Sequence, residues 1–158
     1  MIAATEATEA TAATAATAAT EATAATAATE ATAATEAILL FAHGSRDPGW
    51  SVPFERLAAR VRERRPDVRV AIAYLELMPP TLAEAAAALV GEGARDIAVV
   101  PVFLAPGGHV RRDLPLAVER LRGAHPGARF RVLPTVGEAD AVIDAIAGWI
   151  AAEAGPRG

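Results

Sequence analysis

The stretch IAVVPVFLAPGGHVRRD, residues 97–113, has the pattern of a strand that runs into a glycine-rich turn, after which a helix begins. Its first part is a continuous apolar run, which is typical of a strand buried on both faces. The turn carries His109, Arg111, Arg112 and Asp113. Because ligand sites in open α/β sheets lie at the carboxyl ends of the parallel strands, this turn is a candidate functional site.

A second stretch, ILLFAHGSRDPGW at residues 38–50, has the same layout. Its apolar strand is followed by His43, Arg46 and Asp47, with the His-x-x-Arg-Asp spacing that residues 109–113 repeat. Neighbouring strands lie about 4.8 Å apart, so both histidines would face one crevice if these two strands pair. A divalent metal held about 2.0–2.1 Å from each imidazole nitrogen would keep open coordination positions.

Strand and helix patterns alternate along the rest of the chain, which predicts a parallel sheet with right-handed crossovers. We expect a single α/β domain of flavodoxin-like form, with a four-stranded parallel sheet flanked by helices and the first and third strands side by side. Thr81 and Glu84 predict a capping box, Pro101 predicts the end of regular pairing in the third strand, and Asp113 is the expected N-cap of the third helix. The expected strands lie at 38–42, 68–75, 96–104 and 130–133, and the inner face of the closing helix is expected to contain Ala139, Val142, Ile143, Ile146 and Ile150.

Composition excludes several classes of protein. The 158 residues suffice for one domain, and the absence of cysteine excludes disulfides, thiolate metal sites and cysteine nucleophiles. All 15 basic residues are arginine, and all of them lie beyond residue 36, where the chain has 14 acidic residues. Such a balanced charge does not indicate a nucleic-acid partner, and no G-x-G-x-x-G or P-loop motif indicates a nucleotide.

Residues 1–36 form a low-complexity extension of Thr, Ala and Glu, in which Thr recurs at every third position from Thr5 to Thr35. We expect this extension to be disordered, since it has almost no large apolar side chain to bury. It has neither the basic start of a signal peptide nor the apolar length of a membrane span. We therefore expect a cytoplasmic protein without a membrane partner, whose folded domain covers residues 37–158.

Three motifs in order make the chain resemble a known family. HGSRDP at residues 43–48, YLEL-x-x-P at 74–80 and VPVFLAPGGHVRRDLP at 100–115 are similar to those of the CbiX/SirB family, the class II tetrapyrrole chelatases that include the short form of sirohydrochlorin chelatase. The resemblance implies a chelatase-type fold and insertion of Co²⁺, Fe²⁺ or Ni²⁺ into sirohydrochlorin, on the way to sirohaem, cobalamin or a nickel cofactor. It also implies a homodimer, because long chelatases contain two such units and this chain has one.

Carried onto this sequence, the resemblance implies that His43 and His109 handle the metal and that Glu76 is the accompanying carboxylate. Metallation of a tetrapyrrole needs a loosely held ion and a base that accepts two pyrrole protons, and neutral imidazole serves both needs. Imidazole nitrogen also suits Co, Fe and Ni. The groups placed to hold the substrate's carboxylates are the guanidinium groups of Arg46, Arg111 and Arg112 and the backbone amides around Gly44, Ser45, Gly107 and Gly108.

Each assignment has a simpler alternative. Glu76 could cap a turn or pair with an arginine, and Arg46 and Arg112 could pair with the aspartates that follow them. A non-catalytic protein of the same fold that binds and delivers a metal or a tetrapyrrole is the alternative to an ATP-independent chelatase. The choice among the three metals, and among the pathways, stays open at this point.

Overall fold

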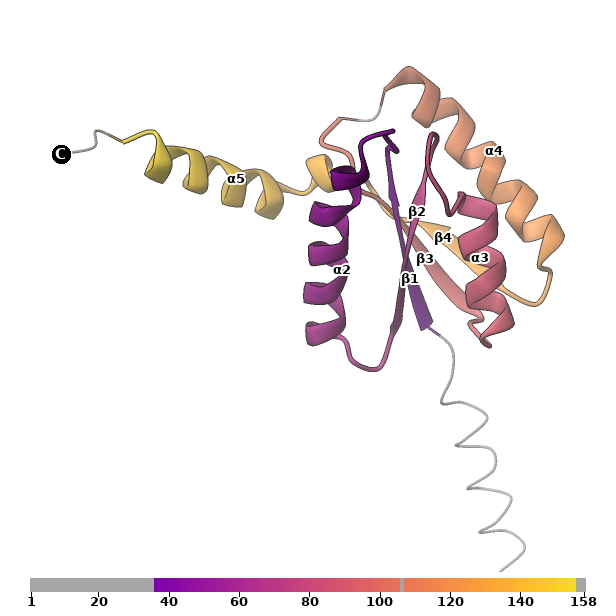
Figure 1. The fold of residues 1–158 in the computed structure, drawn as a ribbon. Helices are drawn as coiled ribbons and strands as arrows, with labels where there is room; N and C mark the ends of the chain where they lie inside the picture. Colours follow the sequence, from indigo (N-terminus) through magenta and orange to yellow (C-terminus); the bar gives the residue numbers. More distant parts are fainter. Residues whose placement is uncertain (1–35, 106, 156–158) are drawn as a thin grey trace, which may run out of the picture. The chain divides into compact units, whose positions relative to one another are not determined.

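Four parallel strands form the centre of the protein in the order β2-β1-β3-β4 (Figure 1). The computed structural model describes residues 36–105 and 107–155, without the side chain of residue 109. The expected parallel sheet, with the first and third strands as neighbours, is confirmed. The strands are β1 (Glu36–Ala42), β2 (Arg69–Tyr74), β3 (Asp96–Pro101) and β4 (Arg129–Val132).

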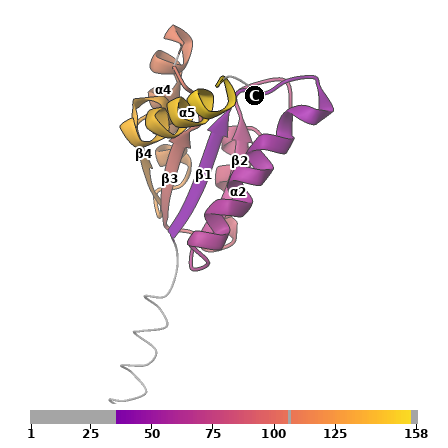
Figure 2. The same cartoon turned by 90° about the vertical axis from the view of Figure 1, so that its left-hand side faces the viewer.

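Helices cover both faces of this sheet (Figures 1 and 2). On one face lies α2 (Val52–Arg64), which follows the 3-10 turn η1 (Pro48–Ser51), and on the other lie α3 (Leu82–Gly91) and α4 (Gly108–Ala124). The chain ends in the 3-10 turn η2 (Val136–Glu138) and helix α5 (Asp140–Glu153). No helix in the described ranges combines the length and the apolar character that a bilayer crossing needs.

The core is much larger on the α3–α4 side of the sheet than on the α2 side. On the α3–α4 side, Leu39, Phe41, Ile97, Val99 and Phe130 are all nearly fully buried beneath the two helices. Alternate residues of the same strands face α2, where the buried cluster is limited to Leu40, Ala58 and Val70. Because side chains alternate along each strand, these two groups of residues point to opposite faces of the sheet. The face covered by two helices is more deeply buried than the face covered by α2 alone.

Several local expectations are confirmed. Thr81 caps α3, and its backbone N–H donates to the Glu84 carboxylate at 2.7 Å, which completes the capping box. β3 ends at Pro101 as predicted, and the Val102 N–H donates to the Phe41 carbonyl in extended chain beyond it. β1 begins at Glu36, the last residue of the expected extension. The expectation of disorder for residues 1–35 lies outside the described residues.

Two expectations about helices are wrong. Helix α4 begins at Gly108 with Gly107 as its N-cap, so Asp113 lies inside the helix and caps nothing. Arg111 and Arg112 consequently lie in the first turns of α4 and not in a loop. Helix α5 forms where a closing helix was expected, but none of its residues is buried, so its apolar face is not an inner face within this chain.

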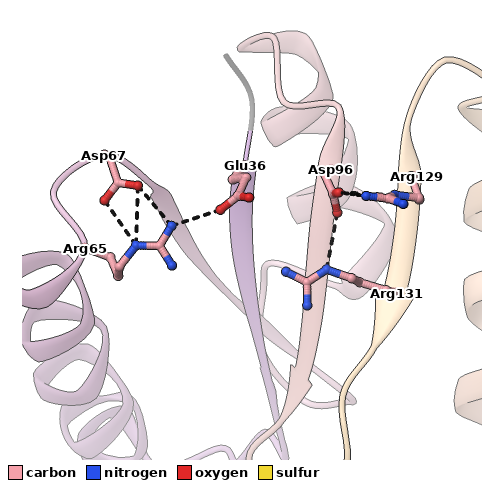
Figure 3. Close-up of polar contacts among 6 residues, drawn as sticks. All are labelled: Glu36, Arg65, Asp67, Asp96, Arg129 and Arg131. Atoms are coloured by element: carbon pink, nitrogen blue, oxygen red, sulfur yellow. Dashed lines mark hydrogen bonds and ion pairs between the residues drawn. The ribbon is translucent and has the colours of Figure 1, made fainter. Parts of the chain in front are cut away.

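Ion pairs concentrate at the amino ends of the strands, opposite the predicted site (Figure 3). Arg65 pairs with Glu36 and with Asp67, both at 2.9 Å. Asp96, which is one quarter exposed, contacts Arg129 and also accepts from the Arg131 Nε–H at 3.3 Å. The hydrogen bond from Arg129 lowers the pKa of Asp96 below its ordinary value of 3.8, although partial burial opposes that shift. Asp96 therefore ties β3 to β4.

We predict that Asp96→Asn lowers the free energy of unfolding at neutral pH, because the carboxylate pairs with two arginines only when it is ionised. A lowered pKa in the folded state gives stability that is complete above the ordinary value of 3.8 and is lost as the pH falls through the lower folded value. The difference between parent and variant should therefore shrink on acidification. Urea unfolding at a series of pH values measures it.

The control is Asp144→Asn, since Asp144 makes no ion pair within the described chain. A deficit of Asp96→Asn that stays constant from neutral pH to pH values well below 3.8 would contradict the assignment.

Candidate active site

The carboxyl end of β1 is bonded to the chain that follows both neighbouring strands. The Phe41 carbonyl accepts from the Val102 N–H at 2.7 Å, and the next carbonyl, that of Ala42, accepts from the Leu75 N–H at 2.8 Å. Successive carbonyls of a strand point to opposite sides, so one holds the loop after β3 and the other holds the loop after β2. The loop that begins with His43 therefore lies between the other two.

The loops that carry His43 and Glu76 are in direct backbone contact at Gly44. A Cβ atom on Gly44 would lie 1.5 Å from the carbonyl oxygen of Glu76, which is far inside any real contact. Directly after Glu76, Leu77 has a φ of 66°, in the left-handed region that leucine rarely adopts. The structure thus brings two of the three predicted metal-handling residues onto adjoining loops, and both side chains are exposed to solvent.

The imidazole of His43 lies against an aromatic ring from the third loop. Its ring centroid is 4.5 Å from that of Phe103, with the planes tilted by 60°. Phe103 is itself buried and makes an edge contact with Phe41, at a centroid distance of 5.8 Å. A buried ring below an exposed imidazole limits the positions that the imidazole can occupy while its polar atoms remain accessible.

The backbone of the His43 loop is held by Trp50 and Asp47. The indole N–H of Trp50 donates to the His43 carbonyl at 3.0 Å. Asp47 caps η1, accepting from the Gly49 N–H at 2.8 Å, and the Asp47 N–H donates to the Ser45 hydroxyl at 3.1 Å. The side chains of Ser45 and Asp47 therefore accept hydrogen bonds from the backbone of their own loop.

The predicted arginines all lie on the surface near these loops. Arg46 is exposed beside His43, and Arg111 and Arg112 are exposed in the early turns of α4. Among the described side chains, no ion pair joins Arg46 to Asp47 or Arg112 to Asp113, so the simple pairing alternative is wrong there. The three guanidinium groups remain candidates for holding an anionic ligand.

The backbone at the start of α4 is a second candidate for anion binding. Gly107 caps this helix of 17 residues without a side-chain hydrogen bond, and its first turn has no acidic residue. The first N–H groups of a helix have no partner within the helix, and the helix dipole favours negative charge there. His109 lies in this first turn, but its side chain lies outside the described residues.

Within the described side chains, which do not include His109, no three His, Asp or Glu residues gather closely enough to hold a metal ion. A cavity of about 430 Å³ lies nearby, between α3 and α4, and reaches Phe41 and Tyr74 at the carboxyl ends of β1 and β2. None of its described lining residues is a predicted site residue. The predicted site is therefore an exposed edge of this chain and not an enclosed pocket.

Comparison with known proteins identifies the family. The family model described as CbiX matches residues 37–152. The chain belongs to the CbiX family. Among curated CbiX relatives, the sirohydrochlorin cobaltochelatase of Methanocaldococcus jannaschii is 39% identical over 57% of this chain, and that of Methanosarcina acetivorans is 40% identical over 49%. The chain spans 63% and 60% of the lengths of these two proteins.

Solved structures agree with this family. A protein of Marinobacter aquaeolei described as a cobalamin biosynthesis CbiX protein is 37% identical, with a TM-score of 0.67 over 75% of this chain and 96% of that one. The sirohydrochlorin chelatase SirB of Bacillus subtilis, solved in complex with cobalt, is 28% identical, with a TM-score of 0.59. The match covers 73% of this CbiX-family chain and 49% of SirB.

Sequence reasoning missed the contributions of Trp50 and Phe103. Both are single aromatic residues in or beside apolar runs, and nothing in their spacing indicates that one holds the His43 carbonyl and the other supports the His43 ring. Only the tertiary structure brings these residues together. The contact between Gly44 and Glu76 likewise joins residues of different loops, and no local sequence pattern records it.

We predict that Gly44→Ala destabilises the protein by about 1–3 kcal/mol, since the added methyl group can be accommodated only if two backbone segments move apart. Gly123→Ala is the control, because Gly123 lies in α4 with open space around its Cβ position. That control should be neutral or stabilising by up to about 1 kcal/mol. Urea denaturation gives both values, and equal stability of the two variants would show that the loops are not in contact.

Proposed function

We propose that this chain inserts a divalent metal ion into sirohydrochlorin without the help of a nucleotide. Membership of the CbiX family and the sirohydrochlorin chelatases among its relatives support this reaction. The observation that carries it is the backbone contact at Gly44, which joins the His43 and Glu76 loops beside the loop that leads to His109. Imidazole and carboxylate groups thereby belong to one edge of the sheet.

In this reaction, one M²⁺ ion replaces two pyrrole protons of the macrocycle. We assign His43 and His109 to binding the arriving ion and accepting these protons, since a neutral imidazole can do either. Glu76 either completes the coordination of the ion or passes protons to solvent, for which its exposed position is suitable. Histidine nitrogen accepts Co²⁺, Fe²⁺ and Ni²⁺ alike.

The substrate is a polycarboxylate, and the groups proposed to hold it surround these residues. Arg46, Arg111 and Arg112 offer guanidinium groups that can bind carboxylates through two parallel hydrogen bonds. The start of α4 at Gly107 and Gly108 has no side-chain cap, and it offers backbone N–H donors together with the amides around Gly44 and Ser45. A large planar anion can therefore approach the open edge and be held at its periphery.

We also propose that the active protein is a homodimer. In the match to SirB this chain covers 49% of that protein, so two copies of the matched region would have about the length of SirB. The site residues lie on an open edge of this chain, and a macrocycle bound there would keep one face in water. A second copy opposite the edge would enclose the substrate.

We predict that the full chain turns over sirohydrochlorin with at least one of Co²⁺, Fe²⁺ and Ni²⁺, followed by anaerobic absorbance without added nucleotide. His109→Ala should abolish turnover and His43→Ala should lower it by roughly 100-fold or more, a loss typical of a missing acid–base group. Comparing the three ions at equal concentration identifies the preferred metal.

His125→Ala is the matched control, because His125 follows the far end of α4, about 24 Å from His109 along the helix. Its turnover should equal that of the parent. A spectral change that stops at one equivalent of protein would instead identify a carrier of metal or tetrapyrrole. Unchanged turnover in both His43→Ala and His109→Ala would refute the assigned roles.

A further inference from the structure

Leu77, on the loop that carries Glu76, has a backbone conformation that is unfavourable for leucine. Its φ is 66°, in the left-handed region, where the Cβ atom of an L-residue crowds the following carbonyl oxygen. Glycine and asparagine adopt this conformation more readily. The Leu77 side chain is nevertheless 54% exposed, so packing within the chain does not account for a leucine at this position. Backbone strain of this kind is concentrated at binding and catalytic sites.

The backbone on both sides of Leu77 is held in place. Two residues earlier, the Leu75 N–H donates to the end of β1 at 2.8 Å. The residues directly before and after Leu77 both contact Gly44: a Cβ atom there would lie 1.5 Å from the Glu76 carbonyl oxygen and 3.2 Å from the Met78 Cγ atom. The position of Leu77 is therefore set by the same contact that joins two loops of the candidate site.

Leu104 is a second exposed leucine, on the loop at the other side of His43. Its side chain is 62% exposed. Its backbone is also held, because a Cβ atom on Gly137 would lie 1.7 Å from the Leu104 carbonyl oxygen, and the Gly137 N–H donates to the Phe103 carbonyl at 3.1 Å. The ring of Phe103 in turn contacts the His43 imidazole. An exposed leucine with a fixed backbone thus lies on each of the two loops that flank the His43 loop.

We propose that Leu77 and Leu104 bind the apolar face of the tetrapyrrole beside the metal-handling groups. This inference rests on the proposed function, because the substrate class supplies the occupant. Sirohydrochlorin has a flat apolar ring with carboxylates at its rim, and the arginines of this edge account only for contacts to the rim. Consecutive α-carbons are about 3.8 Å apart, so a macrocycle of four pyrrole rings whose centre lies at Glu76 extends over Leu77.

The two kinds of contact make different contributions to binding. Guanidinium groups attract the carboxylates, and salt weakens that attraction at exposed positions. A leucine covered by the macrocycle loses apolar surface to water, which favours the complex at any ionic strength. Because the backbone of both leucines is already fixed, little conformational entropy is lost when they make this contact. The leucines therefore favour a ring that lies flat over the site.

Equilibrium binding of metal-free sirohydrochlorin to the full chain, followed by absorbance titration, tests the contact without any turnover. Leu77→Asn removes the apolar side chain but keeps a residue that tolerates the left-handed conformation. It should raise the Kd by roughly three- to tenfold, the effect of leaving one half-exposed leucine uncovered. Leu77→Met keeps an apolar side chain of similar volume and should restore a Kd within about twofold of the parent.

Leu104→Gln should raise the Kd to a similar extent as Leu77→Asn. The matched control is Leu57→Gln, because Leu57 is 37% exposed on α2, outside the three loops, and glutamine is well tolerated in a helix. Its Kd should equal that of the parent. The loss in Leu77→Asn should be the same at low and high salt, whereas the loss in Arg46→Gln should shrink as salt screens the charge.

Urea denaturation of the same variants separates binding from folding. Leu77→Asn should be at least as stable as the parent, because asparagine relieves the backbone strain. A loss of stability in Leu77→Asn that accompanies its weaker binding would assign Leu77 to the fold and overturn its role in binding.

The binding experiment also separates this inference from the proposed reaction. An unchanged Kd in either Leu77→Asn or Leu104→Gln overturns the inference, even where the parent inserts metal. A parent that binds sirohydrochlorin without turning it over refutes the proposed reaction, while a raised Kd in both variants still supports the leucine contacts. A parent that does not bind the tetrapyrrole refutes both.

Discussion

Two successive carbonyls at the end of β1 determine how the candidate site is assembled. The carbonyl of Phe41 holds the chain that leaves β3, and that of Ala42 holds the chain that leaves β2. Because β1 is the strand at which the chain reverses its winding direction, its own loop emerges between the other two. Residues that are more than thirty positions apart in the sequence therefore share one edge without any direct bond between their side chains.

The two faces of the sheet contribute differently to the molecule. The α3–α4 side contains the large side chains of β1, β3 and β4 and supplies most of the buried apolar surface. The α2 side has one helix over half of the sheet and a small buried cluster. The stability that comes from burial therefore comes mainly from the α3–α4 face. The ion pairs of Asp96 and Arg65 secure the amino ends of the strands, away from the candidate site.

The sequence predicts the sheet well, because its signals are local. Continuous apolar runs indicate the strands, Pro101 marks the end of β3, and Thr81 with Glu84 forms the expected capping box. The start of α4 was misplaced because the Gly107–Gly108 pair has poor helix propensity, whereas Asp113 is a favoured cap. In the fold, the chain that returns from β3 already begins the helix at Gly108. Similarly, periodicity predicts the helix α5 and its apolar side, but it does not say whether that side is buried within the chain, and here none of its residues is. For the candidate site, the sequence predicted which residues to consider but not how they contact one another. The Gly44–Glu76 contact and the packing of Phe103 below the His43 ring form only in the tertiary structure.

The contact at Gly44 also determines how the edge responds to a ligand. Main chain lies directly on main chain there, with no side chain between that could change rotamer and absorb a displacement. The two loops must therefore move in concert, and the separation between the attachment points of His43 and Glu76 is preserved during any such movement. For the metal-handling roles proposed for His43 and Glu76, this contact sets the spacing of the two backbone attachment points without closure of a flexible loop.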